Sequence, residues 1–469
     1  MLEKDVYLTT VGKSFLSFIF SLSFLDKGHK VLLLDDERLS YGELFTDTFW
    51  ELEKEFLKTW GRERKISSLE SLETFLMKKH IVFVVGERRI RLGDTPSRNL
   101  VELSRKMPIL SKGRFKDIVQ NIISSEKNIN SFDQSFLSLC RRVGQNCFKY
   151  KTLQSLDMNF FLTHCPGNIK ELYHLFCTIL DSETDNYLGP EWQLKTLALL
   201  GRGFYQKKLT WFANEFERFH FFLCLLSPHY RPDQEGLISS LKDCYQLKGG
   251  QFKKTSIKEW VFHTGTPWCL ELESYEGLVH PERIAFFGGI SNEIPLKIGK
   301  AENFFSSLKI VWDLKEDLEE DFWGERIVKT ELKRLGTQRP FWEASFEKNR
   351  IIINVIIPFE RGSKTSFISE KIEKEMIKEL NPFCPFIEDK IDKREFFFTP
   401  EVWLHGKNIK YYKKPAEMSF YPNVDLYDLS KIGKRRKLKK VDYFGPLKEG
   451  YGLFSSLMEI KDANSFIRF

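Results

Sequence analysis

The chain has 469 residues, of which 42% are hydrophobic and 29% are charged, so it is globular and long enough for two or more domains with sizeable cores. Its net charge of +7 is a mild excess that does not by itself indicate a nucleic-acid-binding protein. No run of about 18 continuous apolar residues occurs, which argues against a transmembrane helix and predicts a soluble protein.

The eight cysteines are scattered and form no C-x-x-C pair. In a chain of this length, that pattern is typical of reduced, mostly buried thiols in the cytoplasm. The closest His/Cys neighbours, His164 with Cys165 and His174 with Cys177, lack the ligand number and spacing of a closed zinc site. We therefore predict a cytoplasmic protein without a metal site.

The first elements in chain order form a β-turn-α-β unit. A β-prone run, Val6 to Val11, leads through Gly12-Lys13-Ser14 into an apolar stretch of helical length. A second strand, Val31 to Leu34, follows and ends in Asp35. Such a turn places backbone N–H groups at a helix N-terminus, where the dipole favours a pyrophosphate. An acidic residue that ends the second strand lies where it can bond a ribose hydroxyl.

The glycines of this unit depart from the dinucleotide-binding pattern. The three positions of G-x-G-x-x-G hold Gly12, Ser14 and Ser17, so one glycine of three is retained. Ser17 is small enough for close helix packing. Ser14, in contrast, puts a Cβ and a hydroxyl where a phosphate would sit, and Phe15 adds bulk. A buried β-α-β unit without any ligand is therefore an open alternative, whereas a signal peptide is disfavoured because Glu3 and Asp5 make the leader acidic as well as basic.

The middle of the chain changes character twice. Helical periodicity dominates as far as about Pro228, with a helix predicted over Ser68–Lys79 and a short strand over Ile81–Val85. The stretch from Tyr230 to Leu237 then introduces a predicted helix that runs through Tyr245 and is closed by Lys248-Gly249-Gly250. Strand-like segments follow it up to a Gly-Gly pair at 288–289.

The most basic segment is the run at 431–440, which contains seven lysines and arginines. Such a run could contact phosphates or an anionic partner. No aromatic residue separates the charges, so a solvated loop that leads into a last buried strand is the preferred interpretation, and nucleic-acid binding is a minor alternative.

The order of these features resembles the FAD-binding-fold oxidoreductases of the phytoene desaturase and amine oxidase type. The features that carry the resemblance are the opening β-α-β unit, the Y-x-P…G-L helix that ends in Gly249-Gly250, the hairpin after it, and a final strand-glycine-helix segment over 441–460. Rab GDP-dissociation inhibitors share this fold without using a flavin. Pro446 stands where the family often has an acidic residue, and proline has no N–H to offer a ligand.

The resemblance implies an α/β fold class. It combines a three-layer Rossmann-like FAD/NAD(P)-binding domain with a second, substrate-type domain of antiparallel sheet and helices. The first domain would be discontinuous, with residues 1–45, 230–300 and 431–469. Residues 46–229 would form a mostly helical insertion, and residues 301–430 the second domain.

Two functions follow from the resemblance. In the preferred one, the cofactor site has closed, no cofactor binds, no residue is catalytic, and the protein acts as an interaction subunit or adaptor with protein partners. The alternative is an FAD-dependent oxidoreductase or desaturase that acts on an apolar or amine substrate. If FAD or another dinucleotide binds, the resemblance implies contacts with Gly12, Ser14, Ser17, Asp35, Gly445 and Gly452. A different small-molecule ligand stays open.

Overall fold

The structure is a computed structural model of the protein. It describes residues 5–35, 49–85, 88–106, 113–150, 157–181, 215–263, 266–287, 305–318, 326–330, 341–358, 365–398 and 440–444, together with residues 454, 457, 458, 460 and 461.

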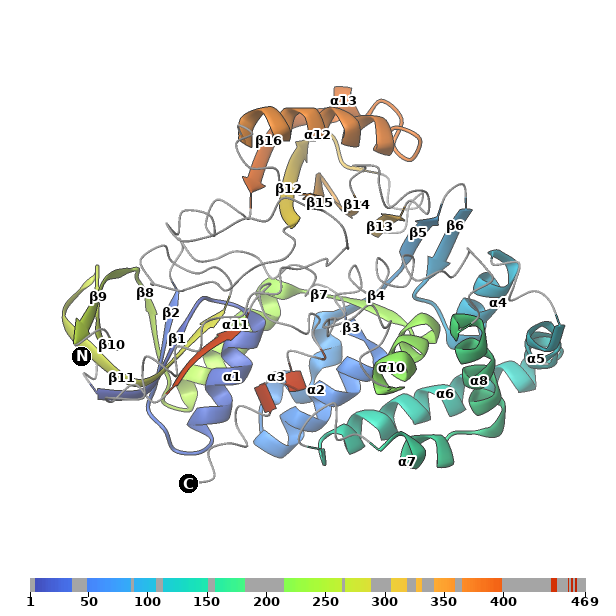
Figure 1. Ribbon diagram of the computed structural model, residues 1–469, viewed down its shortest axis with the longest axis horizontal. Coiled ribbons are helices and arrows are strands. Elements are labelled where there is room, and N and C mark those ends of the chain that lie inside the picture. The colour runs from blue at the N-terminus through green and yellow to red at the C-terminus, as the bar shows by residue number, and fades with distance from the viewer. Residues whose placement is uncertain are drawn as a thin grey trace.

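The first sheet collects strands from both ends and the middle of the chain (Figure 1). Its strand order is β8-β2-β1-β11-β10-β9, and β17 pairs with the second half of β11. The pairs β1–β2, β1–β11, β2–β8 and β11–β17 are parallel, whereas β9, β10 and the first half of β11 form an antiparallel extension. The strands are β1 (Asp5–Val11), β2 (Val31–Asp35), β8 (Gln251–Lys254), β9 (Ile257–His263), β10 (Thr266–Leu272), β11 (Tyr275–Phe287) and β17 (Lys440–Phe444).

Helix α1 (Phe15–Leu25) is the central helix against this sheet. Ten of its eleven residues are buried, which explains why its sequence is apolar on every side. It packs against α11 (Gln234–Leu247), where the ring of Phe18 meets the ring of Tyr245 edge-on at 5.9 Å between centroids. Tyr245 also donates a hydrogen bond to the carbonyl of Val31 at 2.8 Å, so α11 is fixed to β2 as well.

The second sheet is mostly antiparallel and has the order β16-β12-β15-β14-β13-β5-β6. Helix α12 (Thr365–Leu380) lies over it, as Figure 1 shows, and Trp312 donates its indole N–H to Glu373 of that helix at 3.0 Å. The short helix α13 (Ile387–Lys390) follows. The strands are β5 (Ile81–Val85), β6 (Arg88–Leu92), β12 (Phe305–Leu314), β13 (Arg326–Thr330), β14 (Phe341–Glu347), β15 (Arg350–Pro358) and β16 (Ile391–Phe398).

The remaining described elements form a helical layer around a small three-stranded sheet of order β3-β7-β4. One large apolar core connects this layer to the first sheet. The elements are β3 (Phe49–Trp50), α2 (Glu51–Arg64), α3 (Ser67–Glu70), the 3₁₀ helix η1 (Leu72–Phe75), β4 (Leu76–Lys79), α4 (Pro96–Lys106), α5 (Gly113–Ile123), α6 (Glu126–Cys147), α7 (Met158–Thr163), α8 (Gly167–Asp181), α10 (Glu215–Leu226) and β7 (His229–Pro232).

The predicted helix over Ser68–Lys79 is wrong. That segment is divided into α3, η1 and β4, because residues 76–79 pair with β7 in the three-stranded sheet. Strand β7 lies about 150 residues further along the chain, and such a partner is invisible to local periodicity. The predicted strand over Ile81–Val85 is confirmed as β5.

The α/β fold class is confirmed by the two large sheets and their helices. All eight cysteines are free and six of them are buried, as expected for reduced thiols. Within the described ranges, no helix has the length and apolarity to cross a membrane, and no cluster of three potential metal-ligating side chains occurs. The division into three sequence ranges stays a prediction.

Candidate functional site

The candidate site is the turn between β1 and α1, together with the end of β2. Gly12 ends β1 with a φ of +105°, a backbone conformation that glycine adopts without strain. Its N–H donates to the carbonyl of Leu34 at 2.9 Å. A Cβ at this position would collide with the carbonyl oxygen of Phe287 at the end of β11. The close approach of three strand ends therefore requires Gly12, whether or not a ligand binds.

Ser14 and Ser17 form a reciprocal pair at the N-terminus of α1. The N–H of Ser17 donates to Oγ of Ser14 at 3.1 Å, and the N–H of Ser14 donates to Oγ of Ser17 at 2.9 Å. The hydroxyl of Ser17 in turn donates to the carbonyl of Ser14 at 2.7 Å. This is a capping box, in which two backbone donors of the first turn are satisfied by side chains. Both motif positions that lack glycine thus take part in one closed set of hydrogen bonds.

Phe15 contacts the helical layer. Its side chain is buried, and its ring meets the ring of Phe49 edge-on at 5.6 Å between centroids. Phe49 lies in β3, immediately before the start of α2. The bulk that the sequence places after Ser14 is therefore part of the contact between α1 and β3.

Asp35 ends β2 on the same edge of the first sheet as Gly12, because β1 and β2 are parallel and Val11 pairs with Leu34. Its side chain is buried, and its carbonyl accepts a hydrogen bond from Thr255 at 3.2 Å. The structure thus brings Gly12, Ser14, Ser17 and Asp35 to one edge of the sheet. Gly445 and Gly452, the other two predicted contacts, lie outside the described residues.

In the C-terminal segment the structure describes residues 454, 457, 458, 460 and 461. The ring of Phe454 is buried, with centroids 4.7 Å from His220, 5.6 Å from Phe56 and 5.7 Å from Phe216. Lys461 donates to the carbonyl of Cys147 at 2.7 Å. Phe454 and Lys461 therefore contact residues of the helical layer.

Comparison with solved structures identifies the fold. The Rab GDI of Plasmodium falciparum matches with a TM-score of 0.53 at 9% sequence identity, over 99% of each chain. The chain has the FAD-binding fold. A myxobacterial chondrochloren halogenase, described as a variant of FAD-dependent halogenases, matches with a TM-score of 0.45 at 9% identity, over 98% of this chain and 72% of its own. L-proline dehydrogenase from P. horikoshii matches with a TM-score of 0.42 at 9% identity, over 100% and 94%.

No protein-family model and no curated protein matches the sequence. At such low identity the structural likeness shows the fold alone. The resemblance to FAD-binding-fold proteins and the Rossmann-like α/β class are thereby confirmed, with motifs that differ from the dinucleotide-binding pattern at two of the three glycine positions.

The residues of the turn fit the FAD-binding fold better than they fit FAD. In that fold the first turn offers backbone N–H groups to the pyrophosphate, and the second glycine allows the close approach. Here the N–H groups of residues 14 and 17 are already bonded to serine oxygens. A phosphate would have to displace these bonds and accommodate the side chain of Ser14.

The capping box gives a first prediction. Ser14→Ala and Ser17→Ala are each expected to lower the free energy of unfolding by about 1 kcal/mol, because each leaves a backbone donor of the first turn unsatisfied. The double variant is expected to lose clearly less than the sum, because the two serines share one set of bonds. Urea unfolding followed by tryptophan fluorescence measures all three. Ser125→Ala, which removes the one-way N-cap of α6, is the control for an ordinary cap.

Buried charged residues at the start of α2 form a second cluster, which the sequence did not predict. Glu51 accepts hydrogen bonds from the hydroxyl of Tyr230 at 2.7 Å and lies 2.9 Å from Nζ of Lys54. Glu53 accepts from the N–H of Trp50 at 2.7 Å and lies 3.6 Å from Nε2 of His220. Burial and the charge of Glu51 raise the pKa of Tyr230. The run E-L-E-K-E is typical of an exposed helix, so its burial depends on the tertiary partners.

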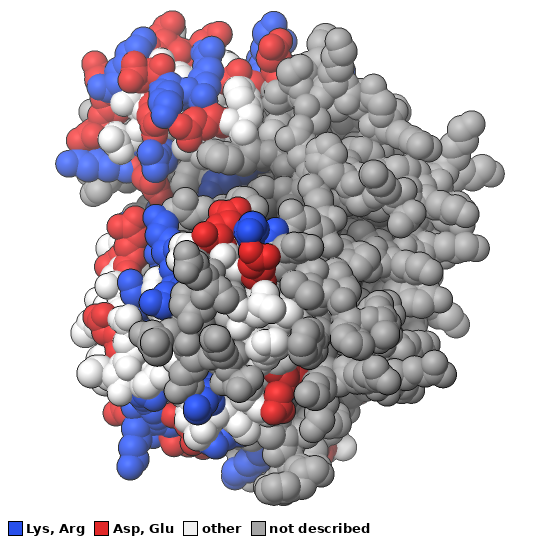
Figure 2. Space-filling view, turned by 90° about the vertical axis from the view of Figure 1, so that its left-hand side faces the viewer, with Lys and Arg blue, Asp and Glu red and all other residues white. Residues whose placement is uncertain are grey.

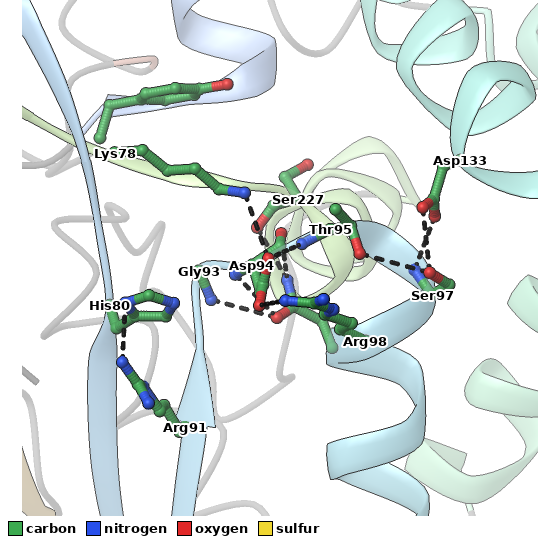
Figure 3. A network of polar contacts seen from close by, with 12 residues as sticks. Lys78, His80, Arg91, Gly93, Asp94, Thr95, Ser97, Arg98, Asp133 and Ser227 are labelled. Atoms are coloured by element: carbon green, nitrogen blue, oxygen red, sulfur yellow. Dashed lines mark hydrogen bonds and ion pairs between the residues drawn. The ribbon is translucent and has the colours of Figure 1, made fainter. Parts of the chain in front are cut away.

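A third polar cluster joins β6 and α4 to the helical layer (Figure 3). Asp94 follows β6 and accepts hydrogen bonds from the N–H of Thr95 at 2.8 Å, from Arg98 at 3.0 Å and from Lys78 at 3.2 Å. Burial opposes ionisation of Asp94, but these hydrogen bonds outweigh it and lower its pKa to about 2. The carboxylate therefore holds the turn, the first turn of α4 and strand β4 together.

The second prediction concerns this carboxylate. Because the pKa of Asp94 is lowered in the folded protein, its stabilisation is present above pH 4 and is lost as the pH falls from 4 towards 2. Asp94→Asn is expected to lower the free energy of unfolding by about 1–2 kcal/mol at pH 7, after allowance for solvent screening. The difference from the wild type should shrink below pH 4. Urea unfolding across this pH range tests it, and Asp317→Asn, in an exposed ion pair, should have no comparable effect.

Proposed function

We propose that this protein is a non-catalytic form of the FAD-binding fold that acts as an interaction subunit or adaptor for other proteins. The observation that carries the proposal is the capping box of Ser14 and Ser17, which uses the donors that a pyrophosphate would need. Retention of Gly12 does not oppose the proposal, because the backbone of β11 requires a glycine there.

The buried carboxylates at the start of α2 give independent support for the proposal. Phe49, which contacts Phe15 at the beginning of α1, is followed two residues later by the buried carboxylates of Glu51, Glu53 and Glu55. A dinucleotide brings two negative charges of its own. Buried carboxylates that follow a residue in contact with the binding turn would disfavour such a ligand.

One observation favours the alternative function. Asp35 lies at the carboxyl end of β2, beside the end of β1, where the dinucleotide-binding proteins of this fold place the residue that bonds the ribose. If FAD binds, it would contact this residue and the turn at Gly12, and it would supply hydride chemistry for an apolar or amine substrate.

The test is spectroscopic. Protein purified from a flavin-rich host is expected to show no visible flavin absorbance, and equilibrium dialysis against FAD is expected to leave no excess of FAD on the protein side. A stoichiometric yellow chromophore released by heat would overturn the proposal.

A double variant shows whether the two serines of the turn are the reason why FAD does not bind. Ser14→Gly/Ser17→Gly restores the glycine pattern and frees both backbone donors, at a cost of only a few tenths of a kcal/mol for the N-cap position. If this variant takes up FAD and the wild type does not, the two serines alone close the site. If neither takes up FAD, the closure extends beyond the turn, and the proposal stands.

A further inference from the structure

Strand β6 forms one edge of the second sheet among the described strands, with β5 as its neighbour (Figure 1). The N–H of Arg91 points away from β5, towards Oε1 of Glu102 in α4, at a long 3.5 Å. Backbone groups two residues apart in a strand point to the same side, so the N–H of Arg89 also faces away from β5. Helix α4 contacts β6 and takes the N–H of Arg91, so the outward backbone N–H that remains in the described part of β6 is that of Arg89.

This edge is strongly basic. Residues 76–106 hold eight lysines and arginines against three acidic residues, a net charge of +5. Neither Arg89 nor Arg91 makes an ion pair with any described residue. The exposed cations of the described part of this segment are Lys78, Arg89, Arg91, Arg98, Arg105 and Lys106.

Two other charged surfaces among the described residues carry both signs of charge. On β16, the opposite edge strand of the same sheet, Lys393 pairs with Glu395 at 2.6 Å and Arg394 pairs with Glu373 at 3.2 Å. The described residues on the face seen in Figure 2 also mix both signs of charge, at the height of α12 as well as below it. The unbalanced charge of β6 is therefore a local property of this edge.

The two arginines of β6 are held in place from within the protein. Arg91 donates to Nδ1 of His80 at 3.2 Å, and because arginine has no acceptor the imidazole must accept here as a neutral ring (Figure 3). Burial and the charge of Arg91 lower the pKa of His80, so the ring is neutral at pH 7. The guanidinium of Arg89 lies 4.5 Å from the ring centroid of Phe383. Such pre-organised side chains lose little entropy when a partner binds.

We propose that β6 binds an extended acidic segment of a partner protein, which adds a strand at this edge and places carboxylates two residues apart against Arg89 and Arg91. The spacing follows from the period of two along a strand, and opposite charges on adjacent strands stabilise the pair. Nucleic acid fits less well, because none of the exposed large hydrophobic or aromatic side chains of the described residues lies on β6. The inference rests on the proposed interaction function and names the partner's chemistry.

Fluorescence anisotropy with a labelled peptide of alternating glutamate and threonine tests the proposal on the full-length protein. Arg89→Glu/Arg91→Glu is expected to weaken binding at least about tenfold. The control variant Lys348→Glu/Lys393→Glu changes the net charge equally at two exposed lysines elsewhere and is expected to bind as the wild type does. Thermal unfolding checks that each variant is folded. If the double variant Arg89→Glu/Arg91→Glu is not folded, the single variant Arg91→Glu replaces it.

Two peptides that are N-methylated at alternate positions separate strand addition from charge attraction. One of them blocks the amides that face β6 and is expected to lose binding, whereas the other is expected to retain it. Equal binding of both methylated peptides, unchanged binding to the β6 variant, or tighter binding of a DNA duplex through the same arginines would overturn the proposal. If the protein takes up FAD and still binds the peptide, only the proposed non-catalytic function is overturned. If the protein is free of flavin and does not bind the peptide, only the proposed docking surface is overturned.

Discussion

Gly12→Ala is expected to lower the free energy of unfolding by about 3–5 kcal/mol. The added Cβ meets the backbone carbonyl oxygen of Phe287, which cannot rotate away as a flexible side chain could. The φ of +105° adds backbone strain for any residue with a side chain. Urea or thermal unfolding measures the loss, and aggregation on expression would be its extreme form.

Gly28→Ala is the matched control for this prediction. Gly28 also has a positive φ, of +78°, but an added Cβ would meet no atom within 4 Å. Its substitution should therefore cost only the backbone strain, about 1 kcal/mol. A similar loss for Gly12→Ala and Gly28→Ala would contradict the collision with β11, and the remaining glycine of the motif would then have to be explained by a ligand.

The opening unit could be predicted from the sequence because its signals are local. A β-prone run, a glycine, a helix-length apolar stretch and a second apolar run are all contained in residues 5–35, and the structure places β1, α1 and β2 there. Helix α11 was predicted for the same reason, since its start at Gln234 and its end before Gly249-Gly250 are marked by local residues.

The elements that were missed depend on distant partners. Strand β4, which was predicted as part of a helix, pairs with β7 about 150 residues further along the chain. Burial of Glu51 and Glu53 depends on Tyr230 and His220 in the same way. No window of the sequence contains both members of these pairs.

The interpretation of Ser14 was incomplete for a different reason. Its side chain was interpreted by size alone, but the spacing of three to Ser17 also carries the signature of a capping box, with serine in place of the usual glutamate. That spacing predicts that the two side chains satisfy the turn from within. The steric interpretation and the hydrogen bonds of the structure lead to the same expectation for a phosphate.

The second large effect is expected at Asn99, which is 1% exposed and bonds to the turn that contains Asp94. Its Oδ1 accepts from the N–H groups of Gly93 and Asp94 at 3.2 and 3.0 Å. Its Nδ2 lies within hydrogen-bonding distance of the carbonyls of Asp94, Leu226 and Ser227, at 3.1 to 3.3 Å. One side chain therefore joins the turn after β6 to the end of α10.

Asn99→Ala should lower the free energy of unfolding by about 3–4 kcal/mol, because it leaves several buried backbone groups without partners. Asn146→Ala, which removes a half-buried side chain bonded to the carbonyl of Arg142 four residues earlier in the same helix, should cost less than about 0.5 kcal/mol. Asn99→Asp keeps the acceptor oxygen but loses both N–H donors and introduces a buried charge. At pH 7 this variant should therefore be at least as unstable as Asn99→Ala. As the pH falls and the carboxyl group is protonated, it should recover part of the lost free energy of unfolding. If Asn99→Ala and Asn146→Ala unfold at similar urea concentrations, the cluster after β6 contributes little to stability. The rigidity inferred for the strand that carries Arg89 and Arg91 would then have no basis.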